Sequence, residues 1–398
     1  MVDHYNRASL APRGRISMQR STERILTTHT GSLPRPEGLV QLMFAKEEGQ
    51  RVDAAELAEQ VSQAVADIVR RQVEAGVDVV SDGEMSKPGY ATYVKDRLTG
   101  FEGESQQFRY QDVADFPELN RRVFSDPGRA RRKTPACIAP ITVRDPQAVQ
   151  RDIDNLRTAT AGAPVREAFM TAASPGVVAL FFHNQYYPSR EAYLHAIADA
   201  QRTEYRAVVD AGFVLQVDCP DLAMGRHIQF ADATLDEFRR QARLNVEALN
   251  AALAGLPRDR VRLHLCWGNY EGPHHYDVPL RDIIEIAFSA HVGAVSFEAA
   301  NPRHAHEWQV FRDVAPPPDM LLIPGVIESC TNYIEHPELV AERIVKLAEL
   351  VGRERVLAGS DCGFGTWVGM ARVDRDVVWA KLGSLAEGAR LASTRLWA

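Results

Sequence analysis

The sequence lacks any apolar run that approaches the roughly 20 residues needed to span a membrane. Its first residues, MVDHYNRASLAPRGRISMQR, contain no apolar core of the kind found in secretory signals. Cysteine is scarce, with five in 398 residues, and this odd number spread over a long chain does not indicate a disulfide framework. These absences argue against a membrane protein and a disulfide-stabilised secreted domain, and we expect a cytoplasmic protein.

The sequence also lacks a concentration of positive charge. The formal net charge is −7, and acidic and basic residues are interspersed, so no basic stripe is available to bind a phosphate backbone. The content of 45% hydrophobic and 25% charged residues is that of an ordinary folded domain. We therefore expect small-molecule partners and no nucleic acid, and in a reducing compartment the cysteines are candidates for metal binding or chemistry.

What the sequence does contain is an alternation of short apolar runs with longer stretches of helical period. This alternation begins at Arg24 and is typical of repeated βα units that build a parallel sheet. The helical patterns cover 53–75, 189–211, 233–254, 280–290 and 337–351. Eight strand–helix units predict a single α/β domain at 24–398, a (β/α)₈ TIM barrel, whose candidate strands are 24–30, 77–82, 177–182, 213–218, 261–266, 294–299, 321–326 and 356–361.

Two segments fall outside this alternation. Residues 101–176, between the second and third predicted strands, are rich in Arg, Asp and Pro and predict an insertion with a hairpin formed by 136–143 and 164–171. Residues 1–23 carry four arginines after position 6, and we expect a mobile N-terminal arm or an extension that packs on a neighbouring subunit of a homo-oligomer.

A doubly wound dinucleotide-binding fold also alternates strands and helices. That fold requires GxGxxG directly after its first strand, where this chain instead reads TGSLPRP. The similar segment GFGTWVG at 363–369 has one residue too many between its later glycines and follows the last predicted strand. We interpret it as a turn, and the barrel remains the predicted fold.

Reactive side chains stand at the carboxyl ends of the predicted strands, where a barrel places its active site. His264 and Cys266 are two residues apart in an extended strand, so both side chains can point to the same face. Glu298 and Cys362 end the sixth and eighth predicted strands. Because zinc prefers tetrahedral sets of Cys, His and carboxylate, these four residues predict one Zn²⁺ site. Three of these ligands together with a water molecule would also form a catalytic zinc site.

Simpler interpretations of the same residues exist. A single buried cysteine is more often a small core residue than a ligand, and one HxC pair changes this little. Other histidines could serve as ligands or be solvated in loops, namely His274, His275, His304 and His306.

Several segments resemble the cobalamin-independent methionine synthase family: TTHTGSLPRP, VVSDGEM, LQVDCPDLAMG, HLCWGN, FEAAN and SDCGFGT. The resemblance covers Arg24 to about Arg390 and corresponds to the catalytic barrel of that family standing alone. It implies a zinc ion held by His264, Cys266, Glu298 and Cys362.

The resemblance also implies a substrate and a reaction. A thiol such as homocysteine would be bound by Ser32, Glu84 and Asp218, whose carboxylates suit an ammonium group, and would receive a methyl or other alkyl group. Zinc would lower the pKa of the thiol and supply a nucleophile at neutral pH.

The chain departs from the family at two positions. Cys219 follows Asp218 where the family has a second acid, and Cys330 aligns with the histidine that the family is thought to use in methyl transfer from the folate. A folate donor needs an acid at its amine leaving group, so the donor here is open.

A second resemblance is to epoxyalkane:coenzyme M transferase, in which a zinc-bound thiolate opens an epoxide. That reaction also needs an acid, and a sulfonate-bearing thiol needs a cation, for which Arg35 and Lys87 are the candidates. Candidates for the acid are His183, Tyr186, Tyr187, His274 and Glu328, with Asp218, His183 and Glu328 as the predicted catalytic residues.

Two other classes of protein remain. A purely structural zinc would be closed by all four ligands and would not respond to added thiol. A barrel like that of uroporphyrinogen decarboxylase works without metal, but it would have no use for a Cys/His/Glu set.

Overall fold

The computed structural model of the chain describes residues 17–105, 108–124, 134–370 and 372–398. Eight parallel strands form one sheet in the order β1-β10-β9-β8-β7-β6-β5-β2. This order follows the chain around a barrel, as predicted. The strands are β1 (Leu26–Thr27), β2 (Val79–Ser81), β5 (Glu167–Ala173), β6 (Val214–Asp218), β7 (Val261–Leu265), β8 (Ala294–Phe297), β9 (Leu321–Ile327) and β10 (Leu357–Ser360).

The barrel closes between β1 and β2 without a regular ladder. The Asp78 backbone N–H donates to the Thr27 carbonyl at 3.2 Å, and the Leu33 N–H donates to the Gly83 carbonyl at 3.1 Å. Side-chain contacts replace the missing ladder between β1 and β2. The Asp78 carboxylate accepts the Thr27 N–H at 2.9 Å and forms an ion pair with Arg24. The partly buried Asp78 carboxylate therefore helps to hold the first two strands together.

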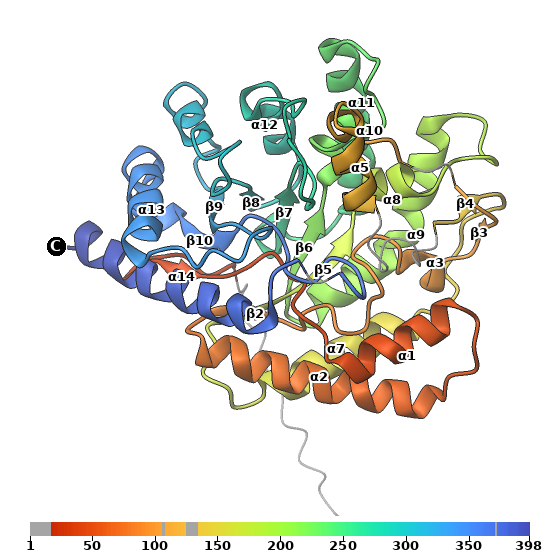
Figure 1. Cartoon of the computed structure of the whole chain (residues 1–398), viewed down its shortest axis with the longest axis horizontal. Helices are drawn as coiled ribbons and strands as arrows, with labels where there is room; N and C mark the ends of the chain where they lie inside the picture. The colour runs from red at the N-terminus through yellow and green to blue at the C-terminus, as the bar shows by residue number, and fades with distance from the viewer. Residues whose placement is uncertain (1–16, 106–107, 125–133, 371) are drawn as a thin grey trace, which may run out of the picture.

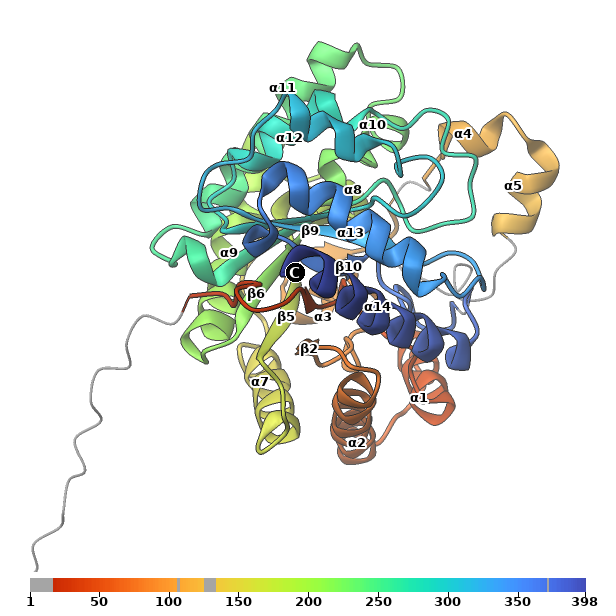
Figure 2. The same cartoon turned by 90° about the vertical axis from the view of Figure 1, so that its left-hand side faces the viewer.

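Helices surround this sheet, as Figures 1 and 2 show. The long patterns predicted from the sequence are all present as helices, and Pro337 occupies the first turn of α13. After β8 the chain forms only a 3₁₀ helix. The helices are α1 (Glu37–Glu47), α2 (Ala54–Glu74), α3 (Val94–Arg97), α4 (Gln111–Ala114), α5 (Pro117–Phe124), α7 (Gln147–Thr160), α8 (Pro175–Phe181), α9 (Arg190–Asp210), α10 (Gly225–Ile228), α11 (Leu235–Ala252), α12 (Leu280–Phe288), α13 (Pro337–Val351) and α14 (Arg375–Leu396), with 3₁₀ turns η1 (Pro220–Leu222), η2 (Arg258–Arg260), η3 (Glu307–Arg312) and η4 (Arg353–Arg355).

The prediction of the third barrel strand at 177–182 is wrong. This segment is the buried helix α8, and the strand is β5, which pairs with β2 and β6. Pro175 begins the helix with a suitable fixed φ, and the Ser174 hydroxyl caps it by accepting the Val177 N–H at 3.0 Å. An apolar run this short has no decisive period, so the cap and the proline determine its conformation.

The predicted hairpin is also wrong in its pairing. β4 (Ala136–Cys137) pairs antiparallel with β3 (Phe101–Glu102), and residues 167–173 belong to the barrel instead. The insertion therefore ends before β5. Figure 2 shows α4 and α5 of this insertion standing out at the edge of the barrel.

The barrel interior is built in layers. At the amino ends of the strands lies an apolar layer that includes Phe169, Val214 and Leu321. Above it lies Arg262, which is buried over the Phe169 ring and donates to the Gln216 side chain at 2.8 Å. The next inward positions on the same strands are His264 and Asp218, which are partners across β6 and β7. The polar site thus stands on a filled core.

The described part of the N-terminal segment packs on its own barrel. Met18 joins the apolar layer at the amino ends of the strands, and its backbone N–H donates to the Asp259 carbonyl at 2.9 Å. The Ser21 hydroxyl donates to the Val356 carbonyl. The prediction for residues 1–16 lies outside the described residues. None of the helices in the described ranges is long and apolar enough to cross a membrane.

Candidate metal and thiol site

The carboxyl ends of the strands open into a cavity with an empty volume of about 620 Å³. Of the predicted site residues, Ser32, Glu84, Asp218, His264, Cys266 and Cys362 line it. These residues lie in or just after the carboxyl ends of five different strands, which explains how positions far apart in the sequence share one wall. The carboxyl end of the barrel therefore brings these six residues together.

His264, Cys266 and Cys362 form a group that could hold a metal ion. One ligand atom from each of these buried residues lies within 4.8 Å of the others. The neighbouring Cys266 thiol, and then burial, raise the pKa of Cys362 well above its usual value. Since a bound dication favours thiolates, a metal at this position would reverse that effect.

The surroundings of His264 fit a metal ligand. Its Nδ1 atom lies 3.4 Å from the Ser296 hydroxyl, while its buried Nε2 atom has no hydrogen-bond partner among the described residues. A buried imidazole nitrogen without a partner is costly unless something binds it. Burial lowers the pKa of His264 to about 3, which keeps the ring in the neutral form that metals require. The donors present therefore suit zinc.

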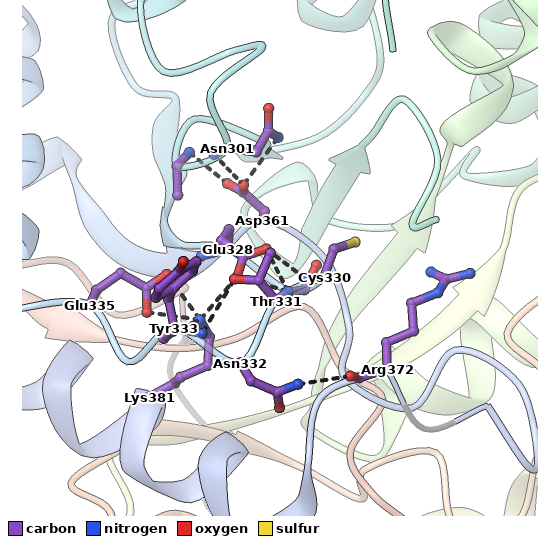
Figure 3. A network of polar contacts seen from close by, with 12 residues as sticks. Asn301, Glu328, Cys330, Thr331, Asn332, Tyr333, Glu335, Asp361, Arg372 and Lys381 are labelled. Carbon is purple, nitrogen blue, oxygen red and sulfur yellow. Dashed lines mark hydrogen bonds and ion pairs between the residues drawn. The ribbon is translucent and has the colours of Figure 1, made fainter. Parts of the chain in front are cut away.

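Glu298, the fourth predicted ligand, lies outside the group of three. Its Oε1 atom accepts the Trp267 N–H at 2.9 Å, and its Oε2 atom accepts from the Asn301 amide at 2.7 Å. Asp361 holds the same loop by accepting the N–H groups of residues 299 to 301, each at 2.8 Å; Figure 3 shows its carboxylate facing Asn301. Burial raises the pKa of Glu298 to about 7. Glu298 is thus fixed at the end of β8, and its ligand role stays a prediction.

Glu84 and Asp218 are two buried carboxylates on one side of the cavity. Glu84 has a φ of 60°, a strained conformation for a non-glycine residue, and such strain is concentrated at functional sites. Its Oε1 atom accepts from Thr171 at 2.9 Å, whereas its buried Oε2 atom has no partner among the described residues. Burial, then the Glu84 charge, raise the pKa of Asp218 well above its usual range. A positively charged substrate group would relieve both carboxylates.

Ser32 stands against the loop that follows β10. Its hydroxyl accepts the Gly365 N–H at 3.4 Å, and its carbonyl accepts the Phe364 N–H at 2.8 Å. A Cβ atom on Gly363 would lie 2.0 Å from the Ser32 hydroxyl. Glycine at 363 therefore allows Ser32 to reach the cavity beside Cys362.

Two of the three predicted catalytic residues lie away from the cavity. His183 is exposed, and its backbone N–H donates to the Ser105 hydroxyl at 2.8 Å. Glu328 accepts from the Cys330 and Thr331 N–H groups and pairs with Lys381 at 3.2 Å, as Figure 3 shows. Glu328 therefore shapes the loop after β9. Asp218 alone of the three lines the cavity.

The other predicted acids are also placed elsewhere. Tyr186 is 49% exposed, and the Tyr187 hydroxyl accepts the Ile141 N–H at 2.9 Å. Cys330 donates to the Asn269 side chain at 3.0 Å and is not among the described cavity residues. Burial raises the pKa of its thiol to about 12, so Cys330 is a poor substitute for an acidic histidine.

The alternative histidine ligands belong to a separate network centred on Asp277. His274 lies 2.8 Å and His304 3.0 Å from its Oδ2 atom, and His227 lies 3.2 Å from its Oδ1 atom. His304 also stacks on Trp267 with ring centroids 3.9 Å apart. This network supports the loop beyond β7. Of the two remaining candidates, His275 pairs with Asp115 at 3.0 Å, and His306 is exposed.

The predicted sulfonate cations are engaged by the protein itself. Arg35 donates to the backbone carbonyls of Gly365, Glu84 and Lys87. Lys87 donates to the Thr171 carbonyl at 2.5 Å. None of the described residues that line the cavity is Lys or Arg.

Sequence reasoning missed the aromatic half of the cavity. Tyr90, Tyr110, Phe181, Tyr270 and Trp367 all line it. Tyr90, Tyr270 and Trp367 offered a signal, since each follows closely a strand-end motif already singled out, namely VVSDGEM, HLCWGN and SDCGFGT. Phe181 was hidden because its helix was predicted as a strand.

Comparisons with known proteins agree with the predicted family and with the barrel fold. The methionine synthase of Saccharolobus solfataricus is 26% identical over 371 residues, which cover 93% of this chain and 95% of that protein. The methionine synthase of Thermococcus kodakarensis is 24% identical over 371 residues, with 93% and 94% covered. In fold, the chain is similar to a B12-independent methionine synthase from Shewanella sp. W3-18-1 in complex with selenomethionine, with a TM-score of 0.71, 19% identity, and 94% and 99% of the two chains covered. The family model described as the catalytic domain of cobalamin-independent synthase matches residues 25–377. The chain therefore belongs to the cobalamin-independent synthase family, and the barrel described above is its catalytic domain.

Proposed function

We propose that this chain is a zinc-dependent thiol alkyltransferase of the methionine-synthase type, which transfers a methyl or other alkyl group to a substrate thiolate such as that of homocysteine. The observation that carries the proposal is the convergence of His264, Cys266 and Cys362 in a cavity that also exposes Glu84 and Asp218. Family membership and the methionine synthases among the relatives support the same reaction class.

In this proposal His264, Cys266, Glu298 and Cys362 would hold zinc, with Glu298 released from part of its present hydrogen bonding. Zinc, when bound, supplies a Lewis acid that favours the thiolate form of a substrate thiol at neutral pH. The ligand atoms of His264, Cys266 and Cys362 belong to residues that line an open cavity, which favours a catalytic over a closed structural site.

Glu84 and Asp218 would hold the ammonium group of the thiol substrate, and Ser32 its carboxylate. The unpartnered oxygen of Glu84 and the raised pKa of Asp218 both indicate buried carboxylates whose burial outweighs the attraction of neighbouring cations such as Lys87. An ammonium group would bring both to the ionised form and fix the orientation of the thiol. This arrangement favours an amino acid thiol over a sulfonate-bearing one, since the cavity offers no described Lys or Arg.

Elemental analysis of the purified protein tests the metal site. We expect about one zinc per chain, and the Cys362→Ser variant should lose both the zinc and the transfer of a methyl group to homocysteine. Cys330→Ser is the matched control for metal content, because Cys330 lies at the same end of the barrel but outside the metal group. An active protein without metal would contradict the proposal.

X-ray absorption at the zinc edge separates a catalytic from a structural ion. Addition of homocysteine should introduce an additional sulfur neighbour at the metal. A spectrum that does not change when the thiol is added would show a closed, structural site.

A further inference from the structure

Three aromatic rings in the cavity form a corner that the proposed function leaves unexplained. This aromatic corner consists of Tyr90, Phe181 and Trp367, whose ring centroids lie 5.2 Å (Tyr90–Trp367), 5.4 Å (Phe181–Trp367) and 5.9 Å (Tyr90–Phe181) apart. The ring planes are inclined by 59°, 63° and 88°, so the rings do not stack and their faces point in different directions. All three residues line the same cavity as the metal group.

The backbone holds this corner in place. Gly89 and Trp367 form an antiparallel bridge, in which the Tyr90 N–H donates to the Thr366 carbonyl at 3.3 Å and the Val368 N–H donates to the Pro88 carbonyl at 2.9 Å. A Cβ atom on residue 89 would lie 2.1 Å from the Trp367 ring. Glycine at this position therefore permits the close approach that brings Trp367 beside Tyr90.

The charged side chains of the described cavity lining have one sign, while Lys87 and Arg35 lie behind Glu84 and lower its pKa. The ionisable residues of the described lining that carry charge are acids or potential thiolates, namely Glu84, Asp218, Cys266 and Cys362, and no described Lys or Arg joins them. A cation above the aromatic corner can lie within about 6 Å of all three ring centroids, the range of cation–π attraction. Both features favour a positively charged ligand that presents methyl groups.

We propose that the alkyl donor is a methylated onium compound, a sulfonium or quaternary ammonium, whose cationic centre is bound by the aromatic corner. This assignment rests on the proposed function, which supplies the thiolate. The carboxylates of Glu84 and Asp218 would bind the thiol substrate on one side, and Tyr90, Phe181 and Trp367 would bind the donor on the other.

The chemistry of an onium donor fits the residues that are present. The thiolate sulfur attacks the methyl carbon, a new C–S bond forms, and the bond from that carbon to the onium atom breaks. The electron pair of the broken bond goes to the leaving sulfur or nitrogen, which departs as a neutral thioether or tertiary amine without taking up a proton. Such a donor needs no acid, so Glu84 and Asp218, the acids that do line the cavity, remain available to bind the thiol substrate.

Direct binding to the purified zinc protein tests the corner independently of turnover. We would measure the affinity of choline and of its neutral isostere 3,3-dimethylbutan-1-ol by isothermal titration calorimetry. We expect choline to bind at least about tenfold more tightly, which corresponds to about 1.4 kcal/mol. Equal affinities would overturn the proposal, because the cavity would then not recognise the positive charge.

Variants distinguish binding of the cation at the aromatic rings from binding at the carboxylates. Trp367→Leu should reduce the preference for choline to less than about twofold, whereas Tyr90→Phe, which keeps the ring, should preserve it. Trp308→Leu is the control for loss of a tryptophan, because Trp308 stacks with Arg312 outside the cavity. A preference that persists in Trp367→Leu would place the cation at the carboxylates and contradict the corner.

A donor assay distinguishes failure of this inference from failure of the proposed function. Homocysteine would be offered S-methylmethionine, trimethylsulfonium or methyltetrahydrofolate, and we expect methyl transfer from at least one onium donor. Transfer from the folate alone would overturn the onium donor but leave the thiol alkyltransferase intact. Absence of transfer from every donor, despite bound choline, would overturn the proposed function and with it the role of the onium compound as donor.

Discussion

At the scale of single residues, His29 illustrates how the core beneath the site depends on protonation. This buried side chain places Nε2 at 2.7 Å from the Gln72 Oε1 atom, and its Nδ1 accepts the Gly31 N–H at 3.1 Å. Both ring nitrogens are thus satisfied in the neutral tautomer that is protonated at Nε2. Burial lowers the pKa of His29 to about 4.

We predict that His29 makes the protein sensitive to acid. An unfolded histidine, with a pKa near 6.5, binds a proton before the folded one does, so stability is lost as the pH falls from about 6.5 through about 4. The loss is on the order of 3 kcal/mol by pH 4. Urea unfolding at pH 7 and pH 4 should show a smaller difference in His29→Gln than in the unaltered chain. His195→Gln, at an exposed position on α9, should behave like the unaltered chain, and an equal acid sensitivity in all three would contradict the role of His29.

At the scale of elements, the loops beyond β2 and β10 are joined through a glycine. Gly89→Ala should destabilise the protein by about 1–3 kcal/mol, because the added methyl overlaps the packed Trp367 ring. Thermal unfolding monitored by near-ultraviolet circular dichroism would report both the stability and the environment of the tryptophan.

Gly383→Ala provides the matched control. Gly383 lies within α14 and an added Cβ meets no atom within 4 Å, so alanine should stabilise the helix by about 0.5–1 kcal/mol. If both alanine variants were stabilising, Trp367 would have to move freely, and the aromatic corner would not be rigid.

At the scale of the whole molecule, a segment from before the first strand completes the barrel. Met18 is 8% exposed and packs into the apolar layer that includes Leu26, Val214 and Leu357, beneath the buried Arg262. We predict that Met18→Ala lowers the free energy of unfolding by about 2–5 kcal/mol.

Denaturant unfolding checks this prediction against Leu350→Ala, a truncation at a 38% exposed position on α13, which should cost at most about 1 kcal/mol. A Met18→Ala variant as stable as this control would show that the layer closes without the N-terminal segment.

The sequence by itself determined the features that depend on local periodicity. The alternation of strands and helices predicted the barrel, and the spacing of His264 and Cys266 placed both on one face, because a strand alternates its side chains regardless of its neighbours. The ends of the strands then predicted that Cys362, Glu84 and Asp218 would share one cavity, since the carboxyl ends of a barrel converge. Their roles as ligands and substrate contacts stay predictions.

Where local signals were balanced or absent, only the tertiary structure determined the conformation and the position of the side chains. The apolar run at 177–182 suits either a strand or a helix, and the Ser174 cap, Pro175 and the pairing of β5 with β2 and β6 decided the outcome. The complete aromatic corner could not be predicted, because Phe181 lies in the run that was predicted as a strand, and its contacts with Tyr90 and Trp367 depend on the position of α8. The same holds for His183, whose backbone N–H donates to Ser105, and for Glu328, whose side chain pairs with Lys381, because both contacts depend on distant parts of the chain.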